Sequence, residues 1–136
     1  MHKFLETARQ LALEHAYEPH LEYRLCSVLV RGGKVLSVGY NHPSNHTLVR
    51  TFKKERAFCN SLHAEADAVR KAFQKISDIS GSKMYTIRLS GKTDSMGPAL
   101  ARPCSMCQSI LKSYGVKRAI YSIDPRTYGV MNMTVK

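Results

Sequence analysis

The sequence lacks any apolar stretch long enough to cross a membrane. Its longest apolar stretches, such as residues 119–123, fall far short of the roughly 18 residues that a spanning helix needs. The first residues also lack the apolar core and the small-residue cleavage site of a secretory signal. We therefore predict an intracellular protein without a membrane partner, located in the cytoplasm or with access to the nucleus.

Acidic residues are scarce in this chain. Only 10 Asp and Glu residues stand against 21 Lys and Arg residues, so the formal net charge at pH 7 is +11. This balance excludes an acidic solvating tail. It favours anionic partners, such as a nucleotide or a single-stranded nucleic acid.

No internal repeat, low-complexity tract or proline-rich linker divides the chain. Its 136 residues suit one domain, residues 1–136, which buries about two thirds of the surface that the unfolded chain exposes. Such a core needs no disulfides, and the chain has only four cysteines. Because no secretory signal is present, we interpret Cys104 and Cys107 as thiolates and not as disulfide partners.

The pattern of apolar residues predicts an α/β fold. Apolar residues at three- and four-residue steps indicate helices, and runs rich in β-branched residues indicate strands. The first expected helix begins near Phe4 and ends near Pro19, and two more cover residues 63–73 and 104–114. The expected strands cover residues 25–30, 35–40, 84–89, 116–123 and 128–135, and residues 90–102 are expected to form a loop. Because helices connect the later strands, we predict a three-layer α/β/α fold whose mixed sheet opens with a hairpin and has parallel later strands.

Two of the predicted helices begin with residue types that bind metals. His63 and Glu65 begin one helix, and the pair Cys104-x-x-Cys107 begins the other. The unpaired N–H groups and the dipole at a helix start favour thiolate over thiol. Two thiolates and one imidazole suit Zn²⁺, and three protein ligands leave the fourth tetrahedral position for water. Glu65 then remains available to move protons, which makes it the candidate catalytic residue.

Two motifs together resemble the signature of the cytidine deaminase superfamily, namely His63-Ala64-Glu65 and Pro103-Cys104-x-x-Cys107. The resemblance implies a zinc-dependent hydrolase that converts cytosine to uracil and releases ammonia. The substrate would be a free cytosine nucleotide or nucleoside, or a single-stranded nucleic acid. Glu65 would take a proton from water and deliver it to the ring nitrogen and the leaving amine. Members of this superfamily commonly form homo-oligomers, so self-association is also expected.

The resemblance also implies substrate contacts. Ala64 would offer backbone groups to the edge of the base, and Asn41 of Gly39-Tyr40-Asn41 would hold the sugar. Basic residues in the long segment after Asn41 are candidates for phosphate or strand contacts. These are Arg50, Lys53, Lys54 and Arg56.

Three alternative hypotheses remain open at this point. Cys59 could join His63 and the cysteine pair in a closed structural zinc site, which would leave Glu65 without a role. A tRNA-type adenosine deaminase shares both motifs, although it usually has a shorter segment after Asn41 and a terminal helix for which little room remains here. The third hypothesis is a catalytically silent, zinc-stabilised module that binds nucleic acid. His42 and His46 are interpreted as solvated loop residues and not as a second zinc site.

Overall fold

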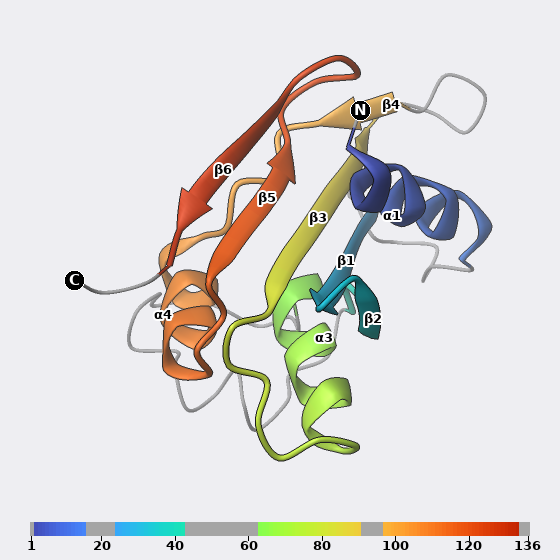
Figure 1. Cartoon of the computed structure of the whole chain (residues 1–136). Coiled ribbons are helices and arrows are strands. Elements are labelled where there is room, and N and C mark those ends of the chain that lie inside the picture. Colours follow the sequence, from blue (N-terminus) through green and yellow to red (C-terminus); the bar gives the residue numbers. More distant parts are fainter. Residues whose placement is uncertain (1, 16–23, 43–62, 91–96, 134–136) are drawn as a thin grey trace.

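Figure 1 shows the computed structural model of the chain, which describes residues 2–15, 24–42, 63–90 and 97–133. Three helices and six strands are present in these ranges. In chain order they are α1 (Lys3–Glu14), β1 (Arg24–Arg31), β2 (Lys34–Tyr40), α3 (Ala64–Phe73), β3 (Lys83–Ser90), β4 (Gly97–Ala99), α4 (Ser105–Ser113), β5 (Arg118–Ser122) and β6 (Tyr128–Asn132). No helix in these ranges has both the length and the apolar character that crossing a membrane requires.

The strands form one mixed sheet with the order β2-β1-β3-β5-β6, and the short strand β4 also pairs with β3. β1 and β2 form the expected hairpin, in which both Gly32 and Gly33 have a positive φ that favours glycine. β3 and β5 run parallel, as predicted, because α4 carries the chain back across the sheet. β5 and β6 run antiparallel, because only residues 123–127 connect them and no helix intervenes.

The strand β4 corrects one prediction. Residues 97–99 fall within the segment that was expected to be a loop, yet they pair antiparallel with β3. Three residues that include Pro98 are too few to show an alternating pattern, so periodicity could not identify this strand.

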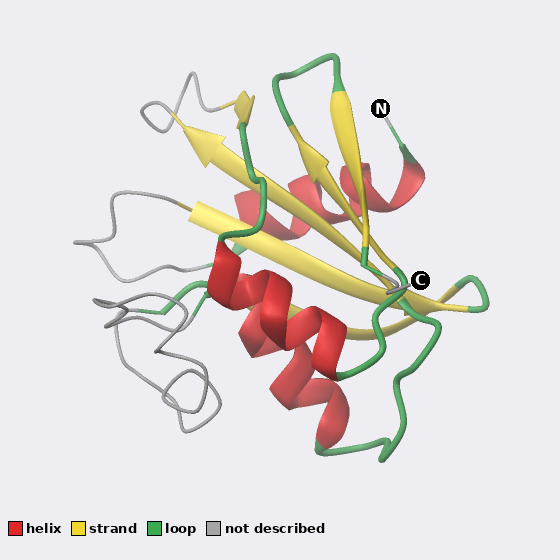
Figure 2. Ribbon diagram, turned by 90° about the vertical axis from the view of Figure 1, so that its left-hand side faces the viewer, coloured by secondary structure: helices red, strands yellow, loops and turns green. Residues whose placement is uncertain are grey.

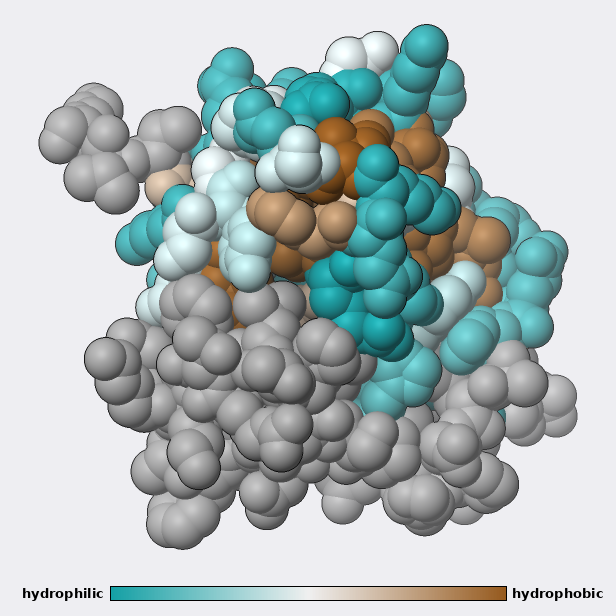
Figure 3. All heavy atoms as spheres, turned by 90° about the horizontal axis from the view of Figure 1, so that it is seen from below, coloured by the Kyte–Doolittle hydropathy of each residue, from teal (hydrophilic) through white to brown (hydrophobic). Residues whose placement is uncertain are grey.

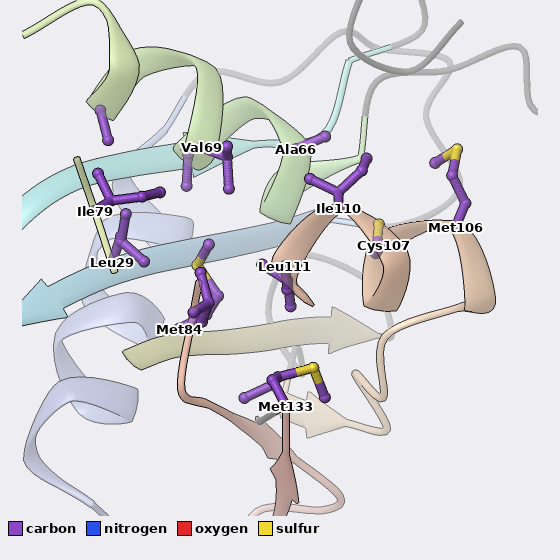
Figure 4. Close-up of a cluster of buried hydrophobic side chains, with 14 residues drawn as sticks. Leu29, Ala66, Val69, Ile79, Met84, Met106, Cys107, Ile110, Leu111 and Met133 are labelled. Atoms are coloured by element: carbon purple, nitrogen blue, oxygen red, sulfur yellow. The ribbon is translucent and has the colours of Figure 1, made fainter. Parts of the chain in front are cut away.

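Helices cover both faces of the sheet, which confirms the three-layer α/β/α fold. Figure 2 shows α3 and α4 on one face and α1 on the other. One apolar cluster fills the space between the sheet and the α3–α4 layer, and it includes Leu29, Val69 and Ile110 (Figure 4). A second cluster joins Leu5 and Ala8 of α1 to the other face of the sheet. Seen from below, hydrophilic side chains cover much of the described surface, with apolar ones exposed between them (Figure 3).

Gly39 allows β2 to lie directly against the first turns of α3. A Cβ atom at this position would lie 2.3 Å from the carbonyl oxygen of Ala64 and 2.3 Å from the backbone nitrogen of Ala68. Both atoms belong to the helix backbone and cannot move aside without shifting the helix. The close approach therefore requires glycine and holds the end of β2 beside the residues that begin α3.

We expect Gly39→Ala to lower the free energy of unfolding by about 1–3 kcal/mol, because the added methyl group overpacks the contact between β2 and α3. Urea denaturation would measure the loss. Gly129→Ala is the matched control, since the three atoms nearest to its added Cβ belong to the end of the Tyr121 side chain and not to a backbone. An equal loss in both variants would contradict this explanation.

Candidate metal centre and active site

The three predicted metal ligands come from the starts of two helices. His63 is the N-cap of α3, and Cys104 is the N-cap of α4. Cys107 lies in the first turn of α4 and is buried. Because α3 and α4 lie side by side and begin on the same side of the molecule (Figure 2), the three side chains converge.

The distances between these side chains fit a single metal ion. Nδ1 of His63 lies 3.6 Å from Sγ of Cys104 and 3.3 Å from Sγ of Cys107. All three potential ligand atoms lie within 4.8 Å of one another. A tetrahedral zinc ion with ordinary bond lengths places nitrogen and sulfur ligands about 3.5 Å apart. The donor set and its spacing therefore suit zinc.

The electrostatics of the helix starts favour anionic sulfur. His63 and Cys104 are the N-cap residues of α3 and α4, where the N–H groups of the first turn and the helix dipole favour a nearby anion. A hydrogen bond from the Cys107 side chain, assisted by His63, lowers the pKa of Cys104 to about 3 despite its burial. Cys104 is therefore a thiolate at neutral pH, which is the form that binds a metal.

Glu65 lies beside the three ligands but is not among them. It occupies the first turn of α3, and only 4% of its surface is exposed. Burial raises the pKa of Glu65 to about 6, although the charge of His63 and a backbone N–H act in the opposite direction. The charge of Cys104 also raises it. A carboxyl group with a raised pKa next to a potential metal site can both accept and donate a proton near neutral pH.

The predicted substrate contacts have different positions. Ala64 is buried as the first residue of α3 and lies between His63 and Glu65. Asn41 directly follows β2, and its Oδ1 accepts a hydrogen bond from the backbone N–H of Leu25 at 2.9 Å. Residues 43–62 lie outside the described part of the chain. They include the four basic residues predicted to contact phosphate and two residues considered for other zinc sites. These residues are Arg50, Lys53, Lys54, Arg56, His46 and Cys59.

Asp67 is a feature of the site region that the sequence interpretation missed. This side chain is completely buried in α3, and its Oδ2 accepts hydrogen bonds from the backbone N–H of Tyr40 at 2.9 Å and from Nζ of Lys71 at 2.8 Å. Nε2 of His42 lies 3.3 Å from the same oxygen, and Nη2 of Arg70 lies 2.6 Å from Oδ1. Burial alone would raise the pKa of Asp67, but these hydrogen bonds and charges hold it below its usual value. The spacing of Asp67, Arg70 and Lys71 along α3 was the only signal in the sequence.

Comparisons with known proteins agree with this arrangement. Residues 1–123 match the protein family described as "Cytidine and deoxycytidylate deaminase zinc-binding region". The comparison with curated protein sequences gives no significant match.

Two solved structures are similar to the chain in fold. Cytidine deaminase from Burkholderia pseudomallei has a TM-score of 0.67 and 19% sequence identity, covering 98% of this chain and 93% of that one. The apo form of dCMP deaminase from the cyanophage S-TIM5 has a TM-score of 0.56 and 19% identity, covering 87% of this chain and 78% of that one. At such low identity the likeness concerns the fold.

Proposed function

Because the chain belongs to the cytidine and deoxycytidylate deaminase zinc-binding family, we propose that it deaminates cytosine to uracil in a free nucleotide or nucleoside. The observation that carries the proposal is the convergence of His63, Cys104 and Cys107 with the buried carboxyl group of Glu65 beside them. A cyanophage dCMP deaminase of similar fold was solved in complex with dCMP and dUMP, which supports a cytosine nucleotide as the substrate class.

The three ligands have a defined task in this proposal. His63, Cys104 and Cys107 would hold the zinc ion, and their thiolate and imidazole donors are those that zinc prefers. When bound, zinc supplies the Lewis acidity that makes water a nucleophile at neutral pH. The starts of α3 and α4 bring the three side chains together, because the two helices pack against the same face of the sheet.

Glu65 moves the protons of the reaction. Its carboxylate accepts a proton from the attacking water and transfers it to the ring nitrogen next to C4. The water oxygen bonds to C4, and Glu65 then carries the remaining proton of that oxygen to the amine, so the C4–N bond breaks, ammonia leaves and the C4–O bond becomes the carbonyl of uracil. Burial of Glu65 excludes bulk water, which strengthens its electrostatic interaction with the reacting atoms.

We expect zinc-loaded protein to release ammonia from dCMP or cytidine. The product should be about 1 Da heavier than the substrate, because O replaces NH, and mass spectrometry would identify it as the uracil compound. A cytosine-containing single-stranded oligonucleotide and tRNA complete the substrate panel. Turnover of the oligonucleotide alone would move the assignment to a polynucleotide deaminase, and inosine in tRNA would identify an adenosine deaminase. No turnover of any substrate by protein with bound zinc would contradict a deaminase and favour the silent module.

A further inference from the structure

The ion pair between Asp67 and Lys71 of α3 binds backbone groups on the outer edge of β2. β2 is an edge strand of the sheet, so one side of its backbone faces away from β1. The N–H of Tyr40 donates to Oδ2 of Asp67, and Nζ of Lys71 lies 3.3 Å from the carbonyl oxygen of Val38, to which it donates. Nζ of Lys71 also binds Asp67 at 2.8 Å. The pair therefore satisfies backbone groups that an exposed edge would leave without protein partners.

The same carboxylate holds both neighbours of Asn41. It accepts a hydrogen bond from the backbone N–H of Tyr40 on one side of Asn41, and Nε2 of His42 on the other side lies 3.3 Å from it. Asn41 itself binds the N–H of Leu25 at the start of β1. The position of Asn41 relative to α3 therefore depends on Asp67.

Asp67 also connects this segment directly to the metal centre. It lies one helical turn after His63, and its backbone N–H donates to the carbonyl oxygen of His63 at 2.9 Å. Gly39 brings β2 against the same helical turns, since only glycine fits beside Ala64. A shift of the end of β2 would therefore change the distance between Asn41 and the residues that begin α3.

A completely buried carboxylate is costly, and apolar residues of similar size often stabilise a fold as well as a buried ion pair does. The partners of Asp67 come from two segments. Arg70 and Lys71 belong to α3, and Tyr40 and His42 lie at the end of β2, so these contacts fix the position of that end along α3. This geometry points to a role in positioning and not only in stability.

We infer that Asp67 is a positioning residue of the deamination site. It holds the end of β2, with Asn41, at a set distance from His63 and Glu65, and it is not one of the three proposed metal ligands. The inference rests on the proposed function, because Asn41 contributes to substrate binding only if a nucleoside or nucleotide occupies the site. Loss of Asp67 weakens substrate binding while the three metal ligands stay in place.

The test compares Asp67→Ala, Asp67→Asn and the control Ser37→Ala in zinc-loaded protein. Ser37→Ala also removes a buried bond between β2 and α3, from Oγ of Ser37 to the carbonyl oxygen of Ala68 at 2.7 Å, but it lies farther from Asn41. We expect Asp67→Ala to raise KM for the cytosine substrate about tenfold, the effect of losing a hydrogen bond to a charged group. In the same variant, kcat and bound zinc should change by less than about twofold, because no reacting group is removed.

The conservative variant and the control decide between positioning and stability. Asp67→Asn retains an oxygen that can accept the N–H of Tyr40, so its KM should rise less than that of Asp67→Ala. Ser37→Ala should lower the melting temperature but leave KM unchanged. An equal rise of KM in Ser37→Ala, or an unchanged KM in Asp67→Ala, would overturn the inference.

Amide hydrogen exchange separates this inference from the proposed function, because it needs no turnover. In Asp67→Ala the amides of Tyr40 and Leu25 should exchange at least about tenfold faster than in the parent protein, whereas Ser37→Ala should leave both amides protected. If the parent protein is inactive but exchange follows this pattern, the proposed function fails and the positioning of Asn41 by Asp67 stands. Unchanged exchange at both amides in Asp67→Ala would overturn the positioning role, whatever the activity.

Discussion

Glu65→Gln should reduce kcat by about 10²–10⁴-fold while zinc remains bound, because general acid–base catalysis typically contributes a factor of this size. The amide preserves the size of the buried side chain but cannot accept the proton of the attacking water. Because Glu65 is not among the three proposed metal ligands, the zinc content should stay at the parent level. Steady-state ammonia release and atomic absorption of the purified variant measure the two quantities.

Glu14→Gln is the matched control for this experiment. It makes the same chemical change at an exposed position at the end of α1, on the other face of the sheet from α3. We expect the control to keep the activity of the parent protein. A fully active Glu65→Gln variant would show that another group moves the protons and would refute the proposed mechanism.

Cys104→Ala should lose zinc, activity and much of the stability that zinc confers. An ion that binds only the folded state stabilises it by about 4 kcal/mol when its free concentration is a thousand times its dissociation constant. The variant should therefore unfold at a lower temperature than the zinc-loaded parent protein. A strong chelator added to the parent protein should produce the same decrease, and thermal unfolding at fixed zinc concentration measures both.

Cys26→Ala is the control for the loss of a thiol. Cys26 is completely buried in β1 and packs in the α1-side cluster, and burial raises its pKa to about 12. This cysteine acts as a small apolar side chain, so the variant should lose some packing energy but bind zinc and remain active. If Cys104→Ala still holds one zinc ion per chain, the ligand assignment is wrong.

The starts of the two site helices were predictable because their signals are local. His63 precedes an alanine-rich stretch with helical periodicity, whereas Cys104 follows a proline and begins a stretch that Gly115 ends. The structure confirms both, with α3 beginning at Ala64 and α4 at Ser105. The ligand types also follow from the sequence, because thiolate and imidazole chemistry does not depend on the fold.

The role of Asp67 and the strand β4 could not be predicted from local sequence patterns. The partners Tyr40 and His42 lie far from Asp67 along the chain, and its spacing from Arg70 and Lys71 is equally typical of a solvated ion pair on a helix surface. Only packing of β2 against α3 buries it. β4 exists because β3 extends beyond its pairing with β5 and offers a free edge to residues 97–99.

By itself the sequence determined the α/β class, the helix starts and the chemistry of His63, Glu65 and the cysteine pair. These depend on side-chain type and on periodicity within a few turns of chain. The tertiary structure decided that Nδ1 of His63 lies 3.3 Å from Sγ of Cys107, that β6 runs antiparallel to β5, and that Asp67 holds the end of β2. Each of these depends on contacts between segments distant in sequence, whose distances are set by how the layers pack and not by local conformational preference.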